Sequence, residues 1–145
     1  MVNYIRRTPQ RREEFQQIQL YGDLEMKLLT VIADIATRWN SIYSMIERAM
    51  KLKDPLDLFA TRHSDNVKLD QLTPDDWEEL TQILALLKPF HELTLRMEGR
   101  AKDGKCRSVW EILPSMEILL QHLEVSKHEY EYSKYRHITT SINNA

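Results

Sequence analysis

Cysteine is almost absent from this chain, and that scarcity bounds its environment. Cys106 is the single cysteine among 145 residues, so no disulfide can form within the chain, and a reducing compartment is indicated. No run of about 18 apolar residues is present, which argues against a membrane-spanning helix. The N-terminus also lacks the apolar stretch of a cleavable signal peptide. These absences predict a soluble intracellular chain.

Glycine and net charge are scarce as well. The chain has three glycines, while Leu, Glu, Lys, Arg and Met are common, and this composition favours helices over an all-β design. The formal net charge is only −2, so no global basic field favours nucleic acid. Any contact with DNA must therefore come from local basic patches.

Sequence motifs of catalytic and metal sites are missing. The chain contains no Gly-rich phosphate loop and no Cys-x-x-Cys pair, and His122 and His128 fall on different faces of a helix. Cys106 lies between Lys105 and Arg107, neighbours that favour a thiolate, but no base at a useful spacing accompanies it. The sequence therefore predicts neither a metal site nor a nucleophilic cysteine.

The hydrophobic spacing predicts a mainly α-helical fold with one short strand. Helical spacing occurs in residues 9–21, 40–53, 56–61, 73–99 and 108–130, with kinks expected at Pro89 and Pro114. The apolar run 27–33 indicates a strand, and the polar stretches 63–72 and 100–107 indicate loops. Because a single strand cannot make a sheet, the partners of this strand would have to come from elsewhere.

Capping residues mark the starts of three of these helices. Thr8-Pro9 and Thr73-Pro74 each place a hydroxyl before a proline in the first helical position. The helix that ends near Lys53 has three candidate N-caps, which are Thr37, Asn40 and Ser41.

Two groups of basic residues are candidates for binding nucleic acid. The first, in a stretch without acids, comprises Arg6, Arg7, Arg11 and Arg12; such a cluster either contacts phosphates or forms a solvated helix face. The second is Arg38 with Trp39, a planar cation beside the largest aromatic surface, which suits phosphate binding and base stacking. For this pair alone, a Trp packed at the helix start with an Arg paired to a carboxylate is the commoner arrangement.

Four segments of the chain carry a family pattern in the family's order. The central one reads Asp34-x-x-Thr37-Arg38-Trp39-Asn40-Ser41-x-Tyr43-x-Met45-x-Glu47-Arg48-Ala49. It resembles the D..TRWNSTY.M.ERA block of hAT-type transposases. Residues 4–15 resemble the family's IR.S.QR...F segment, and residues 72–94 and 108–123 resemble its L...EW..L......LKPF...T and S.VWEILP....LL.HLE patterns. Ile42 departs from the family, which usually has Thr at this position.

The resemblance implies an RNase H-like transposase with an all-α insertion domain. Such enzymes hold divalent metal ions such as Mg²⁺ with three acidic residues to cleave and transfer DNA strands. In the family, two aspartates precede the Arg-Trp block and a glutamate lies far downstream, so none of them is expected in this chain, and Asp34 is not taken as catalytic. The family's BED-type zinc finger is likewise not expected here. We expect no catalysis and no cofactor.

By the same resemblance, Trp39 stacks against a flipped base at a hairpin DNA end and Arg38 contacts the neighbouring phosphate. An aromatic face can return roughly 1–3 kcal/mol of the stacking that an extruded base loses. The basic residues Arg6, Arg7, Arg11 and Arg12 would extend this DNA-binding set. The missing hydroxyl at Ile42 is the one departure near this site.

The expected organisation is a basic helix and RNase H-like edge strand in residues 1–36, followed by a helical insertion-domain segment in 37–145. Residues 138–145 resemble the start of the family's next helix, so the segment is expected to be truncated. The expected function is that of a non-catalytic piece of a transposase that binds DNA ends, in the nucleus by resemblance and otherwise in the cytoplasm. The alternative is a helical module for protein–protein interaction or self-association. No membrane or small-molecule partner is expected.

Overall fold

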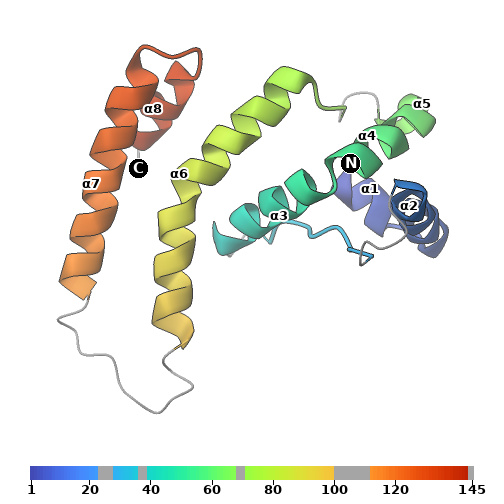
Figure 1. Ribbon diagram of the computed structural model, residues 1–145, viewed down its shortest axis with the longest axis horizontal. Helices are drawn as coiled ribbons and strands as arrows, with labels where there is room; N and C mark the ends of the chain where they lie inside the picture. Colours follow the sequence, from blue (N-terminus) through green and yellow to red (C-terminus); the bar gives the residue numbers. More distant parts are fainter. Residues whose placement is uncertain (23–27, 36–38, 68–70, 100–111, 144–145) are drawn as a thin grey trace. The chain divides into compact units, whose positions relative to one another are not determined.

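The computed structural model describes residues 1–22, 28–35, 39–67, 71–99 and 112–143 (Figure 1). In these ranges the chain forms α-helices and no strand, which confirms the predicted helical class. The helices are α1 (Val2–Arg6), α2 (Pro9–Gly22), α3 (Trp39–Lys51), α4 (Lys53–Arg62), α5 (Ser64–Val67), α6 (Pro74–Gly99), α7 (Ile112–Glu131) and α8 (Arg136–Asn143). They belong to two compact units, Met1–Thr81 and Gln82–Ala145.

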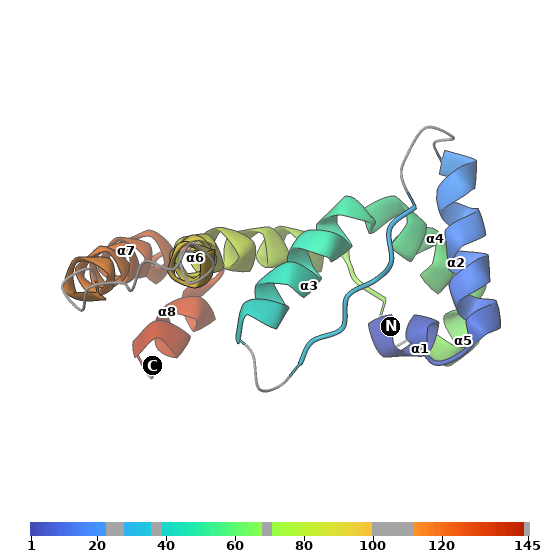
Figure 2. The same cartoon turned by 90° about the horizontal axis from the view of Figure 1, so that it is seen from below.

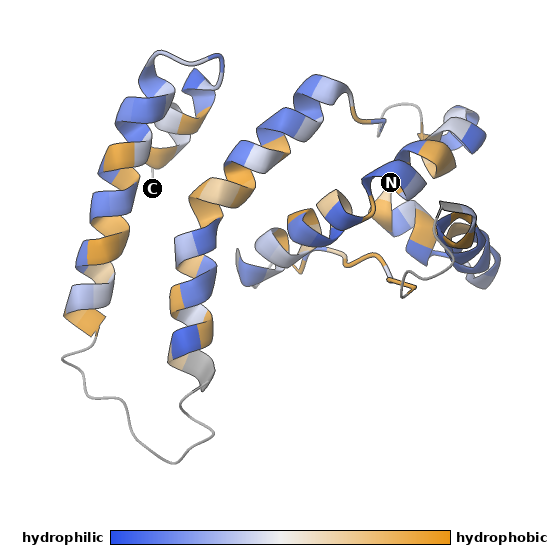
Figure 3. Ribbon diagram, in the orientation of Figure 1, coloured by the Kyte–Doolittle hydropathy of each residue, from blue (hydrophilic) through white to orange (hydrophobic). Residues whose placement is uncertain are grey.

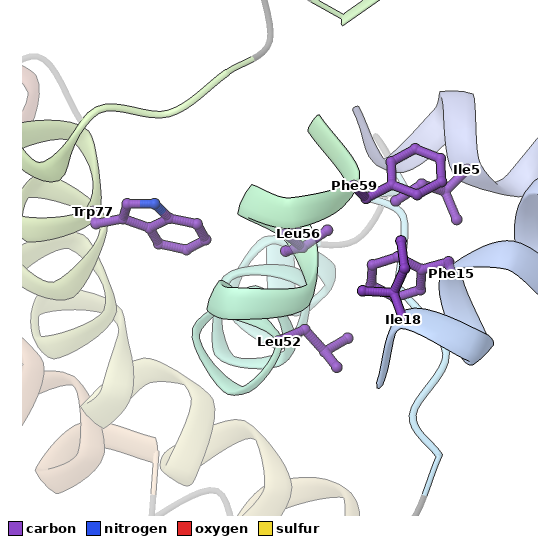
Figure 4. Packing of buried hydrophobic residues seen from close by; sticks show 7 residues of the cluster. All are labelled: Ile5, Phe15, Ile18, Leu52, Leu56, Phe59 and Trp77. Carbon is purple, nitrogen blue, oxygen red and sulfur yellow. The ribbon is translucent and has the colours of Figure 1, made fainter. Parts of the chain in front are cut away.

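The first unit is built around one apolar cluster, shown in Figure 4. Phe59 of α4 lies at its centre and is fully buried. Its ring meets the ring of Phe15 edge to face, with centroids 5.7 Å apart, and that of Tyr4 at 6.3 Å. The other buried members of the cluster are Ile5, Ile18, Leu52, Leu56 and Trp77. The cluster joins α1, α2, α4 and the first turn of α6.

Helix α2 begins where the Thr8-Pro9 pair predicts. The backbone N–H of Arg11 donates to the hydroxyl of Thr8 at 3.4 Å. Pro9 occupies the first helical position, where its missing N–H removes one of the donors that a helix start leaves unpaired. The helix runs to Gly22, so the predicted segment 9–21 is confirmed.

The helix predicted to run to Lys53 is divided in two. Leu52 breaks it with φ −113° and ψ 20°, and its buried side chain packs into the cluster. Helix α3 therefore ends at Lys51, and α4 extends the predicted helix 56–61 at both ends. Two of the predicted N-caps, Asn40 and Ser41, are wrong because α3 already begins at Trp39. The third, Thr37, lies outside the described residues.

The predicted loop 63–72 contains a turn of helix, α5, so this prediction is wrong in part. The backbone N–H of His63 donates to Phe59 O at 3.1 Å and ends α4. Val67, the last residue of α5, is buried. A single apolar residue in a polar stretch does not predict a helix from the sequence. In the structure, burial of the Val67 side chain stabilises this helical turn.

The strand predicted in residues 27–33 is not found, and residue 27 lies outside the described part. Residues 28–35 are extended (Figure 2) but pair with no strand within the described ranges. Instead, the side-chain amide of Gln19 donates to Leu29 O and accepts from Leu29 N–H, both at 2.9 Å. On the other side Arg48 Nη1 donates to Thr30 O at 2.9 Å. Side chains of α2 and α3 thus make hydrogen bonds to backbone groups that would pair with a neighbouring strand in a sheet.

Helix α6 starts with a capping box, as the Thr73-Pro74 pair predicts. Both the backbone N–H and the hydroxyl of Thr73 donate to Asp76 Oδ2, at 2.7 and 2.8 Å, and Asp76 N–H donates back to the Thr73 hydroxyl at 3.2 Å. The hydrogen bonds from Thr73 hold the pKa of the Asp76 carboxyl below its ordinary value. The helix then continues through Pro89.

The second unit consists of α6 from Gln82 onward, α7 and α8. Tyr130, Tyr135 and Ile138 form its buried cluster, against which Ile83, Leu86 and Ile142 pack. His122 Nε2 lies 3.0 Å from Leu86 O, and the Tyr130 hydroxyl lies 3.2 Å from Gln82 Oε1. Burial, with a smaller contribution from Glu129, raises the pKa of the Tyr130 phenol. Helix α8 confirms the helical turn predicted from residue 138, and the predicted helix start at 108 lies outside the described residues.

Candidate nucleic-acid interface

The four N-terminal arginines divide into one that packs within the protein and three that are exposed. The guanidinium of Arg11 lies over the Tyr4 ring, 3.6 Å from its centroid, and Nη1 donates to Tyr4 O at 3.4 Å. Arg11 therefore joins α2 to α1 through a cation–π contact. Arg6, Arg7 and Arg12 are exposed, and none of them forms an ion pair with a carboxylate of the described residues.

Arg6 and Arg12 line the same pocket although they belong to different helices. Arg6 ends α1, and Arg12 lies in the first turns of α2. Together with residues 29–31 of the extended segment they line a pocket of about 220 Å³. Arg7 follows α1 with helical backbone angles and does not line the pocket. The structure thus places two of the predicted residues at one site.

The wall of this pocket is held in place by residues that the sequence did not single out. Gln19, 8% exposed, bonds both backbone groups of Leu29, and Arg48 of α3 bonds Thr30 O. Figure 2 shows the extended segment passing between α2 and α3. The available sequence signal was the position of Gln19, four residues after Phe15 and thus on the apolar face of the helix, because a buried side-chain amide is almost always hydrogen-bonded.

The Arg38-Trp39 pair is described only in part. Arg38 lies outside the described residues, and of Trp39 the structure gives the backbone, which starts α3. In the first turn of α3, the hydroxyl of Ser41 accepts from Ile35 N–H at 2.9 Å and donates to the Asp34 carboxylate. The family-like residues Asp34 and Ser41 therefore tie the end of the extended segment to the first turn of α3. This contact gives Asp34 a structural role.

Within the described ranges, no three His, Cys, Asp or Glu side chains are grouped as metal ligands. Over the same ranges, no helix combines the length and the apolar character that crossing a bilayer requires. Cys106 and the basic loop 100–107 lie outside the described part.

The comparisons with known proteins agree on one family. The model of the ZBED1 RNase-like helical domain matches residues 1–86. A protein of Talaromyces stipitatus named as transcriptional regulator tpeD is 34% identical over 140 residues, covering 96% of this chain and 15% of its own length. A protein of Zea mays named as AC transposase is 30% identical over 101 residues, covering 68% of this chain and 12% of its own length.

A third relative is the zinc finger BED domain-containing protein RICESLEEPER 2 of Oryza sativa subsp. japonica, 25% identical over 91 residues, which are 63% of this chain and 12% of that protein. This chain thus spans less than one sixth of the length of each of these relatives. No solved structure matches. The family model covers more than half of the chain and agrees with the four sequence blocks, so the chain belongs to the hAT transposase family and carries its RNase-like helical domain in residues 1–86.

Proposed function

We propose that this chain binds DNA ends through phosphate contacts on its N-terminal helices and carries no catalysis by itself. The observation that carries the proposal is the exposure of Arg6, Arg7 and Arg12 at the adjoining ends of α1 and α2. A guanidinium that has no carboxylate partner can bind two phosphate oxygens at once, because no ion pair has to break first. The family resemblance supports the rest, because it places the three catalytic acids outside the matched segments.

Trp39 completes the proposed site by resemblance. The start of α3 is tied to the extended segment through Ser41 and Asp34, and the Leu29 end of that segment adjoins Arg6 and Arg12. The start of α3 and the pocket lined by Arg6 and Arg12 both belong to the first unit, Met1–Thr81. By the resemblance, Trp39 would stack an unpaired base at a DNA end while the arginines bind phosphates elsewhere along the same DNA. The nucleus is the compartment in which such a protein would meet its DNA.

A salt titration tests the phosphate contacts. Affinity for a hairpin-ended DNA should fall with salt with a log–log slope of about −0.9 for each neutralised phosphate, hence about −3 for three arginines. Replacing Arg6, Arg7 or Arg12 by Ala should reduce the magnitude of that slope by about 1. Fluorescence anisotropy from low to moderate salt measures it.

Arg96→Ala is the matched control, since Arg96 is exposed on α6 and belongs to the other unit. It should leave the slope unchanged. Trp39→Ala should leave the slope unchanged too and remove the preference for hairpin-ended over blunt duplex. A wild-type protein that does not bind DNA at low salt contradicts the proposed function.

A second candidate function, self-association, is favoured by the surface of α7. Leu113, Met116 and Leu120 are 71%, 54% and 61% exposed and lie at positions i, i+3 and i+7, on one face of the helix. Figure 3 shows apolar residues along the length of α7. Exposed apolar stripes of this kind commonly mark protein contacts.

Light scattering distinguishes this second candidate from the first. If the stripe joins two copies, the molar mass should rise with concentration, and Leu120→Glu should restore the monomer because it places a charge in the contact. Glu129→Ala is the control, since Glu129 is exposed on α7 and lies nine residues after Leu120, on the opposite face of the helix. A wild-type monomer at high concentration excludes self-association through this face.

A further inference from the structure

The pocket between α1, α2 and the extended segment combines an apolar floor with a cationic rim. Ile5 and Phe15, both members of the buried cluster, supply the floor. Arg6 and Arg12 supply the rim, and Gln16 adds a side-chain amide on the α2 side. The opposite wall is the backbone and side chains of residues 29–31.

The charge of the pocket selects an anionic ligand. No carboxylate lines it, whereas two arginines do. Neither guanidinium is paired with an acid in the part of the chain that the structure describes. Helix α2 carries two acids, Glu13 and Glu14, and neither lines the pocket. Glu14 is engaged elsewhere, since its Oε2 lies 3.0 Å from Nε2 of His63. The rim is therefore free to bind phosphate oxygens.

The size of the pocket restricts what can enter between the arginines. Its volume of about 220 Å³ is below the roughly 300 Å³ at which pockets for drug-sized ligands begin. One planar ring fits this volume better than a larger group. The amide of Gln16 and the hydroxyl of Thr30 offer hydrogen-bonding groups to the edge of such a ring.

We infer that this pocket binds a single unpaired nucleotide of DNA, with the base against the apolar floor and its flanking phosphates on Arg6 and Arg12. This inference rests on the proposed function and assigns to it a second nucleotide site, apart from Trp39. The pocket wall is fixed before binding because Gln19 and Arg48 hold Leu29 and Thr30 from opposite sides. A preformed wall lowers the ordering cost of binding.

The test compares a duplex with one unpaired nucleotide against the same duplex fully paired. Enclosing one base in the pocket should make the wild-type protein prefer the bulged duplex by about tenfold, which corresponds to about 1.4 kcal/mol. Gln16→Trp fills the pocket from α2 without changing charge, and Thr30→Trp fills it from an exposed position that tolerates a large side chain. Each should bring the ratio of the two Kd values to about one.

Two variants serve as matched controls. Gln17→Trp adds the same ring one residue away, at an exposed position that does not line the pocket. Arg7→Ala removes a positive charge outside the pocket. Both should keep the tenfold ratio, although Arg7→Ala weakens binding to both duplexes. Thermal melts of every variant establish that the unit is folded.

The outcomes separate this inference from the proposed function. Two results would show that the pocket does not bind the nucleotide. In the first, the wild-type protein binds both duplexes equally. In the second, the filled variants keep the preference for the bulged duplex and only Trp39→Ala removes it. The proposed DNA binding would stand in both cases. If an acidic peptide of equal charge competes as well as the bulged DNA, the site recognises charge alone and the inference fails. If no DNA is bound at all, both fail.

Discussion

Phe59→Ala should lower the free energy of unfolding of the first unit by about 3–5 kcal/mol. Phe59 is fully buried at the centre of the cluster, and its ring contacts Phe15 and Tyr4 edge to face and lies 4.4 Å from the centroid of His63. Truncation removes both the transfer free energy of the ring and those contacts, and leaves a cavity. Because a domain is stable by only about 5–15 kcal/mol, the variant should be close to unfolding.

Urea unfolding followed by circular dichroism measures this loss. Leu58→Ala is the matched control, because the neighbouring Leu58 of the same helix is 42% exposed and its truncation should cost less than about 1 kcal/mol. Equal losses for the two variants would mean that Phe59 is not at the centre of the core. An unchanged unfolding midpoint for Phe59→Ala would contradict the packing described above.

Gln19→Leu should cost about 2–3 kcal/mol, although it replaces a polar residue by an apolar one of similar size. The amide of Gln19 makes two hydrogen bonds of 2.9 Å to the backbone of Leu29. A leucine leaves that N–H and that C=O without their partner, and the cost of unpaired backbone groups exceeds the gain from burying a methyl group. The extended segment should therefore loosen from α2.

Amide hydrogen exchange at Leu29 reports this loosening directly. Exchange should accelerate in Gln19→Leu and stay slow in Gln17→Leu, since Gln17 is exposed on the same helix. A Gln19→Leu variant that is as stable as the wild type, with unchanged protection at Leu29, would show that the two hydrogen bonds contribute nothing net. Binding of the bulged duplex offers a second readout, because the pocket wall depends on Leu29.

The sequence predicted the helices that carry local start signals. Thr8 with Pro9 and Thr73 with Pro74 begin α2 and α6 where expected, because capping depends on residues within one turn. The division of the third helix was not predictable in this way. Leu52 is apolar and fits a helical pattern, and its break depends on how α3 and α4 pack on the cluster.

The strand prediction failed for a related reason. Leu29 and Val31 are apolar because they pack against the cluster of the first unit, and an apolar run does not reveal what bonds its backbone. Here the partners are side chains of Gln19 and Arg48, which are remote in sequence. Only the tertiary structure brings these residues together.

The candidate site was predicted as a set of residues and not as an arrangement. The four N-terminal arginines look alike in the sequence, yet Arg11 lies on Tyr4 while Arg6 and Arg12 share a pocket. Helical spacing could not separate them, because the difference depends on the angle between α1 and α2. The role of Arg38 and Trp39 stays a prediction.

Helix α6 has a practical consequence for dividing this protein. The boundary between the two compact units, Thr81 and Gln82, falls inside this single helix. A truncation ending at Thr81 would leave only four residues after Trp77, so the residue whose ring packs on the first core would stand beside a fraying helix end. A version of the first unit made for crystallisation or NMR should therefore retain the helix to Gly99, and a version of the second should begin at Thr73, which brings its own cap.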